Sequence, residues 1–78
     1  MSISDRIVEI LCREFGDAYR GVITSDTVRE DIEIWDSLSG VRLLLALERE
    51  FKARFSMDEA AAMTSVREIR DVIERKLS

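Results

Sequence analysis

The fold of this chain is decided by residues 35–51, which read WDSLSGVRLLLALEREF. Asp36 and Ser37 are both residue types that cap helix N-termini, and the residues after them follow a helical pattern to residue 51. The stripe expected to face the core comprises Leu43, Leu44, Leu47 and Phe51. The nearly opposite face carries Leu38, Val41 and Leu45, with Arg42 and Arg49 beside them. A small domain cannot easily bury both faces, so either this helix is the centre of the bundle or its second stripe stays exposed for a partner.

The residues before this stretch predict one helix and a long loop. The helix is expected over residues 1–15, with Ser2 or Ser4 as its N-cap, and Gly16 stands where a left-handed residue would end it. Its apolar stripe comprises Ile3, Ile7, Ile10 and Leu11. Residues 17–35 show no sustained period, so we expect an ordered loop with a short helical turn near residues 27–30. Trp35 ends this loop and is expected to pack as an anchor that fixes the entry of the next helix.

The residues after the central stretch predict one short and one longer helix. The short helix is expected over residues 58–63, with Ser56 or Asp58 as its cap. Ser65 followed by Glu68 is the pattern of a capping box, so the last helix opens there. The residues of this region expected on the core are Phe55, Met57, Val66, Ile69, Val72, Ile73 and Leu77. The prediction is an all-α fold, a small helical bundle of three main helices and one short helix, with a long loop between helices one and two.

Length and composition indicate one globular domain. The chain has 78 residues, 46% of them hydrophobic and 36% charged, and we expect a single domain over residues 1–78. The formal net charge is −4, and the basic residues are spread among acidic ones, which argues against nucleic-acid binding. The longest apolar run, residues 43–47, is too short to span a membrane. The single cysteine, Cys12, and an N-terminus unlike a signal peptide lead us to expect a cytoplasmic protein.

The absence of histidine excludes several chemistries. Zinc sites that use imidazole and hydrolases that use a Ser-His-acid triad both need this residue, and one cysteine cannot build a thiolate metal cage. No residue is recognisable as a general base for Ser37 by the usual route. We therefore predict no catalytic residue and no metal site, and the chain is not expected to be an enzyme. Chemistry at Ser37 would have to be carried out by another protein.

The central stretch resembles the signature of acyl carrier proteins and the related peptidyl carrier domains. The likeness rests on the triplet Asp36-Ser37-Leu38, followed by Val41, Leu43, Leu47, Glu48 and Phe51. It extends over nearly the whole chain, through the first helix, the loop with Asp31-Ile32 and Trp35, and the Thr64-Ser65-Val66 start of the last helix.

The resemblance implies a covalent modification of Ser37. In that family the equivalent serine is joined through a phosphodiester to 4′-phosphopantetheine, whose thiol carries an acyl group as a thioester. A phosphopantetheinyl transferase installs this arm from coenzyme A. Asp36 has two compatible roles, as the N-cap of the helix and in recognition of the serine by the transferase.

The resemblance also implies partners, namely an acyl ligase, an acyltransferase or a synthase. The cargo could be a fatty acyl group, a polyketide unit or an amino acid. The residues expected to bind partners are Leu38, Val41, Arg42, Leu45, Glu48 and Arg49. Many fatty-acid carriers have a strongly acidic second helix, whereas this helix also carries Arg42 and Arg49. These arginines either pair with neighbouring glutamates at the surface or retune partner choice toward a dedicated pathway.

Three further expectations concern cargo, assembly and the rival interpretation. Family members that carry long chains often shelter them between helices, but the bulky Phe51 and Phe55 argue against a roomy resting cavity here. No long heptad seam is present, so we expect a monomer. The rival interpretation is a non-enzymatic helical module that docks a partner through Leu38, Val41 and Leu45, with Ser37 as a simple cap.

Overall fold

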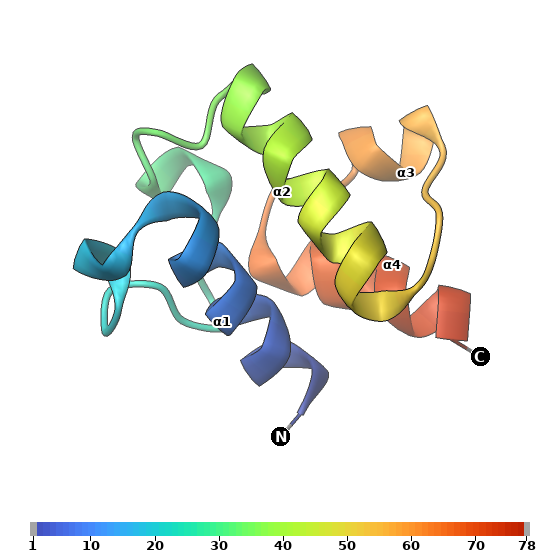
Figure 1. Ribbon diagram of the computed structural model, residues 1–78, viewed down its shortest axis with the longest axis horizontal. Helices are drawn as coiled ribbons and strands as arrows, with labels where there is room; N and C mark the ends of the chain where they lie inside the picture. The colour runs from blue at the N-terminus through green and yellow to red at the C-terminus, as the bar shows by residue number, and fades with distance from the viewer. Residues whose placement is uncertain (1, 78) are drawn as a thin grey trace.

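The computed structural model describes residues 2–77, apart from the side chain of Ser37, and this range is built from helices and loops (Figure 1). The four α-helices are α1 (Ile3–Phe15), α2 (Ser37–Phe51), α3 (Met57–Ala61) and α4 (Val66–Leu77). Two short 3₁₀ helices, η1 (Asp17–Tyr19) and η2 (Arg29–Asp31), lie in the long loop between α1 and α2. The predicted all-α bundle of three main helices and one short helix is confirmed. Over the described residues, no helix has the length and apolar character needed to cross a membrane.

Helix α1 begins and ends close to the predicted residues. Ser2 is the N-cap, and it forms a capping box with Asp5, whose backbone N–H donates to the Ser2 hydroxyl at 3.0 Å. Residue 1, which the sequence analysis included in this helix, lies outside the described residues. Gly16 ends the helix with φ 120° and ψ 154°, which is an extended conformation and not the expected left-handed helical one. Both conformations have a positive φ, which glycine adopts without a Cβ penalty.

The long loop is ordered by a few buried side chains and one short pairing. Ile23 and Ile32 are buried, whereas the other isolated apolar residues of the loop are partly or largely exposed. Val28 forms an isolated antiparallel bridge with Ser65, at the start of α4. The helical turn expected near residues 27–30 is η2, shifted to Arg29–Asp31, and η1 was not predicted.

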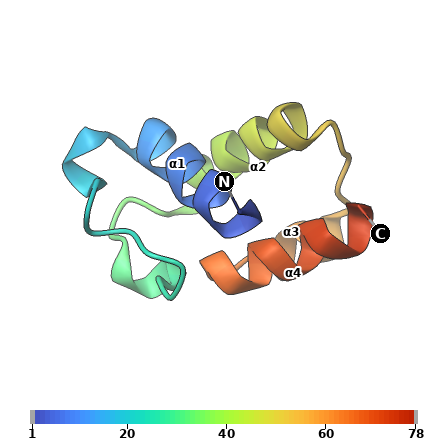
Figure 2. The same cartoon turned by 90° about the horizontal axis from the view of Figure 1, so that it is seen from below.

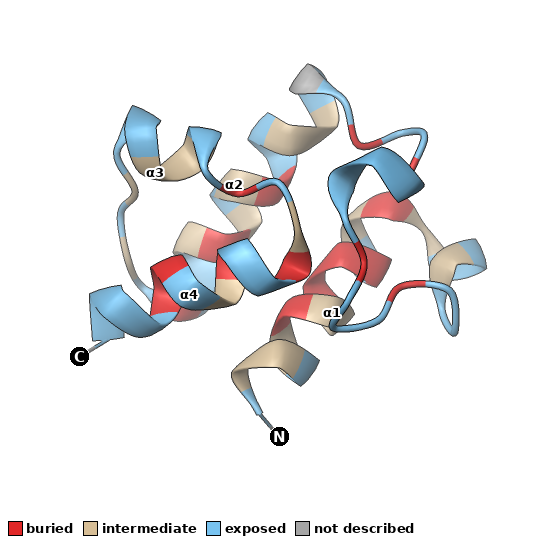
Figure 3. Ribbon diagram, turned by 180° about the vertical axis from the view of Figure 1, so that it is seen from behind, coloured by how far each residue is buried: buried red, intermediate tan, exposed pale blue. Residues whose placement is uncertain are grey.

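The core lies where α1 packs against both α2 and α4 (Figures 2 and 3). Its fully buried side chains are Ile7, Ile10, Leu11, Leu47, Val66, Ile69, Val72 and Ile73. Two predicted core residues are wrong: Met57 is 89% exposed and Leu77 is 53% exposed. Ser56, not Asp58, caps α3, so Met57 becomes the first residue of that helix and points outward. Leu77 is the last residue of α4, beyond the part of the helix that the core covers.

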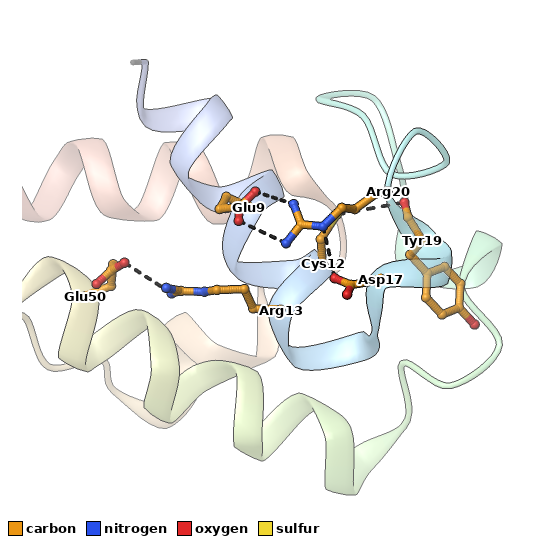
Figure 4. Close-up of polar contacts among 7 residues, drawn as sticks. All are labelled: Glu9, Cys12, Arg13, Asp17, Tyr19, Arg20 and Glu50. Carbon is orange, nitrogen blue, oxygen red and sulfur yellow. Dashed lines mark hydrogen bonds and ion pairs between the residues drawn. The ribbon is translucent and has the colours of Figure 1, made fainter.

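Exposed ion pairs join α1 to its neighbours (Figure 4). The Arg20 guanidinium donates to both carboxylate oxygens of Glu9, at 2.7 and 3.1 Å, and to Asp17 at 3.0 Å. The hydrogen bonds from Arg20 hold the pKa of Glu9 below its usual value. Arg13 pairs with Glu50 at 3.1 Å and so ties α1 to the end of α2. Pairs this exposed are screened by solvent and add little to the free energy of unfolding, so the core carries the fold.

Candidate functional site

The site predicted from the sequence lies at the N-terminus of α2. Asp36 is the N-cap, with an extended backbone and a carboxylate that accepts the backbone N–H of Ser39 at 3.0 Å. This N–H is the main cause that lowers the pKa of Asp36 below its usual value. Asp36 is exposed and ionised at neutral pH, so the site contains a fixed negative charge.

Ser37 is the first residue of α2, although its side chain lies outside the described part of the chain. Backbone N–H groups at a helix N-terminus lack intrahelical partners, and together with the helix dipole they favour an anion by about 0.3–1 kcal/mol. A phosphodiester attached to this residue would therefore meet a favourable backbone environment. The exposure of the hydroxyl, which the carrier interpretation requires, stays a prediction.

Two residues from the long loop fix the approach to α2. Trp35 is only 5% exposed and its ring centroid lies 5.7 Å from that of Phe15, so its predicted role as a packing anchor is confirmed. Arg29 donates from Nε to the carbonyl of Trp35 at 3.1 Å, and its backbone N–H donates to the carbonyl of Thr64 at 2.8 Å. Arg29 thus connects the start of α4 with the start of α2. The sequence analysis missed Arg29, because a single arginine in an aperiodic loop carries no motif.

The outward face of α2 is apolar and exposed. Leu38 is 73% exposed, and Val41 and Leu45 are each 54% exposed. Of the two alternatives open at the sequence level, the structure therefore shows the second, in which this stripe stays at the surface. Scattered single apolar residues are ordinary on protein surfaces, but these three residues share one face of the helix.

The charged residues on α2 behave differently from one another. Arg42 and Arg49 are exposed, and within residues 2–77 neither forms an ion pair. The pairing with neighbouring glutamates that one interpretation predicted is therefore absent from the described structure. Glu48 instead accepts the backbone N–H of Phe55 at 3.0 Å, which fixes the loop between α2 and α3. Glu48 thus makes a structural contact in addition to its predicted role in partner binding.

A pocket of about 470 Å³ lies between α2, α3 and the end of the long loop. Its walls are mostly apolar, and the lining residues are Arg29, Trp35, Asp36, Gly40, Val41, Leu43, Leu44, Leu47, Met57, Ala60, Ala61 and Met63. Neither Phe51 nor Phe55 lines this pocket, so the expectation that these residues argue against a roomy resting cavity between the helices stays a prediction. The small side chains of α3, Ala60 and Ala61, leave the space open. A volume of this size is within the range that small ligands occupy.

Two other kinds of site, a metal centre and a reactive thiol, depend on residues that the structure describes. No group of three or more histidine, cysteine, aspartate or glutamate side chains among them could hold a metal ion. Cys12 is buried in the core, and burial raises the pKa of its thiol, which makes it a poor nucleophile.

In comparisons with known proteins, no family model matches this chain, but curated relatives do. The chain is 31% identical over 74 residues to the acyl carrier protein of Buchnera aphidicola subsp. Baizongia pistaciae (strain Bp). The aligned region covers 95% of this chain and 94% of the relative. The similarity therefore extends over nearly the whole chain and is not confined to one motif.

Proposed function

Since this chain belongs to the acyl carrier protein family, we propose that it carries an acyl or aminoacyl group on a 4′-phosphopantetheine arm attached to Ser37. Proteins of this family are carriers and not enzymes, and they generally bear this arm. The arm supplies a thiol that holds the cargo as a thioester. The chain itself would contribute the attachment point, the surface that partners bind and the shelter that the cargo needs.

The observation that carries the proposal is the position of the Asp-Ser-Leu triplet at the first turn of α2. Asp36 occupies the N-cap, so Ser37 is the first helical residue and Leu38 lies exposed beside it. We propose that a serine in this position is accessible to a transferase. No general base is needed on this chain, because the transferase would take the serine proton. The serine oxygen would bond to the phosphorus of the phosphopantetheine, the pyrophosphate bond of coenzyme A would break, and adenosine 3′,5′-bisphosphate would leave. We propose that Asp36 both caps α2 and takes part in recognition by that transferase.

The proposed partner face comprises Leu38, Val41, Arg42, Leu45, Glu48 and Arg49. Its apolar residues supply contact area, and the unpaired Arg42 and Arg49 favour partners with acidic surfaces. This charge pattern differs from that of the acidic fatty-acid carriers, so we propose a dedicated pathway in place of bulk fatty-acid synthesis. The partners would be a phosphopantetheinyl transferase and the acyl ligase, acyltransferase or synthase of that pathway, and we propose a cytoplasmic monomer.

The pocket between α2 and α3 gives the cargo a place to rest. Leu43, Leu44 and Leu47 form its inner wall, and Ala60 and Ala61 leave room on the opposite side. An apolar acyl chain that folds back from the arm would remove its surface from water there, at about 25 cal/mol for each Å² buried.

The modification can be tested by intact mass. The protein is incubated with coenzyme A and a broad-specificity phosphopantetheinyl transferase, and we expect the mass of one phosphopantetheine to be added. Ser37→Ala should abolish the addition, whereas Ser39→Ala, the matched serine in the same helical turn, should retain it. An unchanged mass with several transferases would favour the rival interpretation, in which the exposed stripe of Leu38, Val41 and Leu45 docks a partner without any modification.

A further inference from the structure

We infer that the guanidinium of Arg29 binds the phosphodiester of the arm on Ser37 and directs the arm over the pocket between α2 and α3. This inference rests on the proposed function and adds to it a positioning residue that no motif marks. Arg29 comes from the long loop, not from α2, so it can act on the arm without disturbing the partner face.

The backbone and the side chain of Arg29 are each held by a hydrogen bond. Its backbone N–H donates to the carbonyl of Thr64 at 2.8 Å, next to the bridge between Val28 and Ser65. Its Nε donates to the carbonyl of Trp35 at 3.1 Å. This arrangement commits one of the guanidinium donors and leaves the terminal Nη groups available, since Arg29 forms no ion pair within the described residues.

The held guanidinium is close to the attachment residue. The carbonyl that it binds belongs to the residue two positions before Ser37, and Cα atoms two residues apart are separated by no more than about 7 Å. Arg29 and Asp36 both line the pocket, where they are the only charged residues in its described wall. The remaining wall is apolar apart from the indole of Trp35.

Attachment of the arm would bring two negative charges close together at this site, and a nearby cation would reduce their repulsion. Asp36 is exposed and ionised at neutral pH, and the backbone N–H of Ser39 stabilises its carboxylate. A phosphodiester on the next residue would place a second negative charge beside it. Arg29 is the positive charge that the fold places at the same end of the pocket. Two N–H groups of a guanidinium also match two phosphate oxygens in a bidentate arrangement, which a lysine cannot reproduce.

The consequence concerns the direction of the arm. An arm whose phosphate is held by Arg29 leaves the domain on the pocket side of α2. Leu38 and Leu45, which do not line the pocket, then stay free for partners. Without Arg29 the arm would still be installed, but it would sample more directions.

The test compares the apo and phosphopantetheinylated forms of three proteins: wild type, Arg29→Gln and Arg54→Gln. Arg54 is a matched control, since it is exposed, forms no ion pair in the described chain and follows the opposite end of α2. Arg29→Gln removes the hydrogen bond to the carbonyl of Trp35 from both the apo and the modified form. The effect of this loss on stability therefore cancels when the two forms of the variant are compared. For each protein, the folding equilibrium constant of the modified form is divided by that of the apo form. We expect this ratio to be the same in wild type and Arg54→Gln, and several-fold smaller in Arg29→Gln. The ³¹P resonance of the arm should shift in Arg29→Gln and keep its position in Arg54→Gln.

A second measurement needs no variant and therefore does not depend on the folding of Arg29→Gln. The side-chain ¹H–¹⁵N signals of Arg29 in the wild type should shift between the apo and modified forms, while those of Arg54 should not. A mass increase together with equal stability differences and an unmoved Arg29 signal would overturn the inference and leave the proposed function standing. A failure to add the arm to the wild type would overturn both.

Discussion

The two faces of α2 both carry leucines, but the leucines of one face are buried and those of the other are exposed. Leu43 and Leu47 on the inner face are 2% and 0% exposed, whereas Leu38 and Leu45 on the outer face are 73% and 54% exposed. Burial of a leucine side chain stabilises a fold by about 1.5–3 kcal/mol, and an exposed leucine contributes little of this. The inner face therefore accounts for folding, and we propose that the outer face binds partners. Substitutions on the two faces should separate these effects.

The largest expected effect is on the inner face. Leu47→Ala should lower the free energy of unfolding by about 2–5 kcal/mol, because Leu47 is fully buried and its truncation leaves a cavity. A domain of this size has only about 3–5 kcal/mol available from its core, so this variant should be largely unfolded. Leu45→Ala, two residues earlier in the same helix, should change the free energy of unfolding by less than about 0.5 kcal/mol. Urea unfolding followed by circular dichroism measures both, and equal losses would contradict the division between the faces.

The inner face could be predicted from the sequence because helical periodicity and burial follow from the same spacing. Leu43, Leu47 and Phe51 recur on one side of the helix, and all three are buried. Helix ends were also readable where a capping residue stands beside its partner, as Ser2 does with Asp5. The wrong predictions of buried residues concern a helix with two possible N-caps and a helix that extends beyond the core. Met57 became exposed when Ser56 capped α3, and Leu77 lies at the end of α4.

The candidate site was predictable only in part. The triplet at Asp36 marks the helix start and its family likeness, since a short motif carries that information locally. Arg29 and the pocket depend on how the loop and α3 fold back against α2, and contacts between residues far apart in the chain leave no periodic pattern. The small Ala60 and Ala61 gave no hint of a cavity, because alanine is also the ordinary residue of a short helix.

The second largest effect should appear on the outer face, in binding and not in folding. Leu38→Ala with Leu45→Ala should raise the KM of a phosphopantetheinyl transferase for the carrier by about tenfold or more, since exposed apolar anchors carry much of an interface. Leu77→Ala is a matched control, because Leu77 is 53% exposed but lies on α4. An unchanged KM for the double variant, or an equal rise in the control, would show that the outer stripe does not bind this enzyme.

A smaller, several-fold effect is expected from the arginines of the outer face. Arg42→Glu with Arg49→Glu should raise the association rate with a fatty-acid ketosynthase that has a basic docking patch, and the gain should shrink at high salt. The change can be measured by surface plasmon resonance at two ionic strengths. Arg67→Glu with Arg75→Glu on α4 gives the same net charge away from the partner face and should have a weaker effect. No change in rate or affinity for the α2 variant would end the idea that these arginines select partners.

The smallest effect concerns Gly40, which lies between the two faces and borders the pocket. A Cβ at this position would lie 4.0 Å from Nε1 of Trp35, which is ordinary van der Waals contact, and the backbone has no positive φ. Gly40→Ala should therefore stabilise the domain by about 0.5–1 kcal/mol, because alanine favours a helix more than glycine does. The same substitution at Gly21, whose φ is 83°, should destabilise it, since an L-residue is strained there.

Because the added methyl group occupies pocket volume, a long acyl chain on the arm should stabilise Gly40→Ala less than it stabilises the wild type in urea unfolding. Such a result would mean that glycine at this position leaves room for the acyl chain at a small cost in the stability of the fold. Equal stabilisation of the two acylated proteins would place the acyl chain outside the pocket.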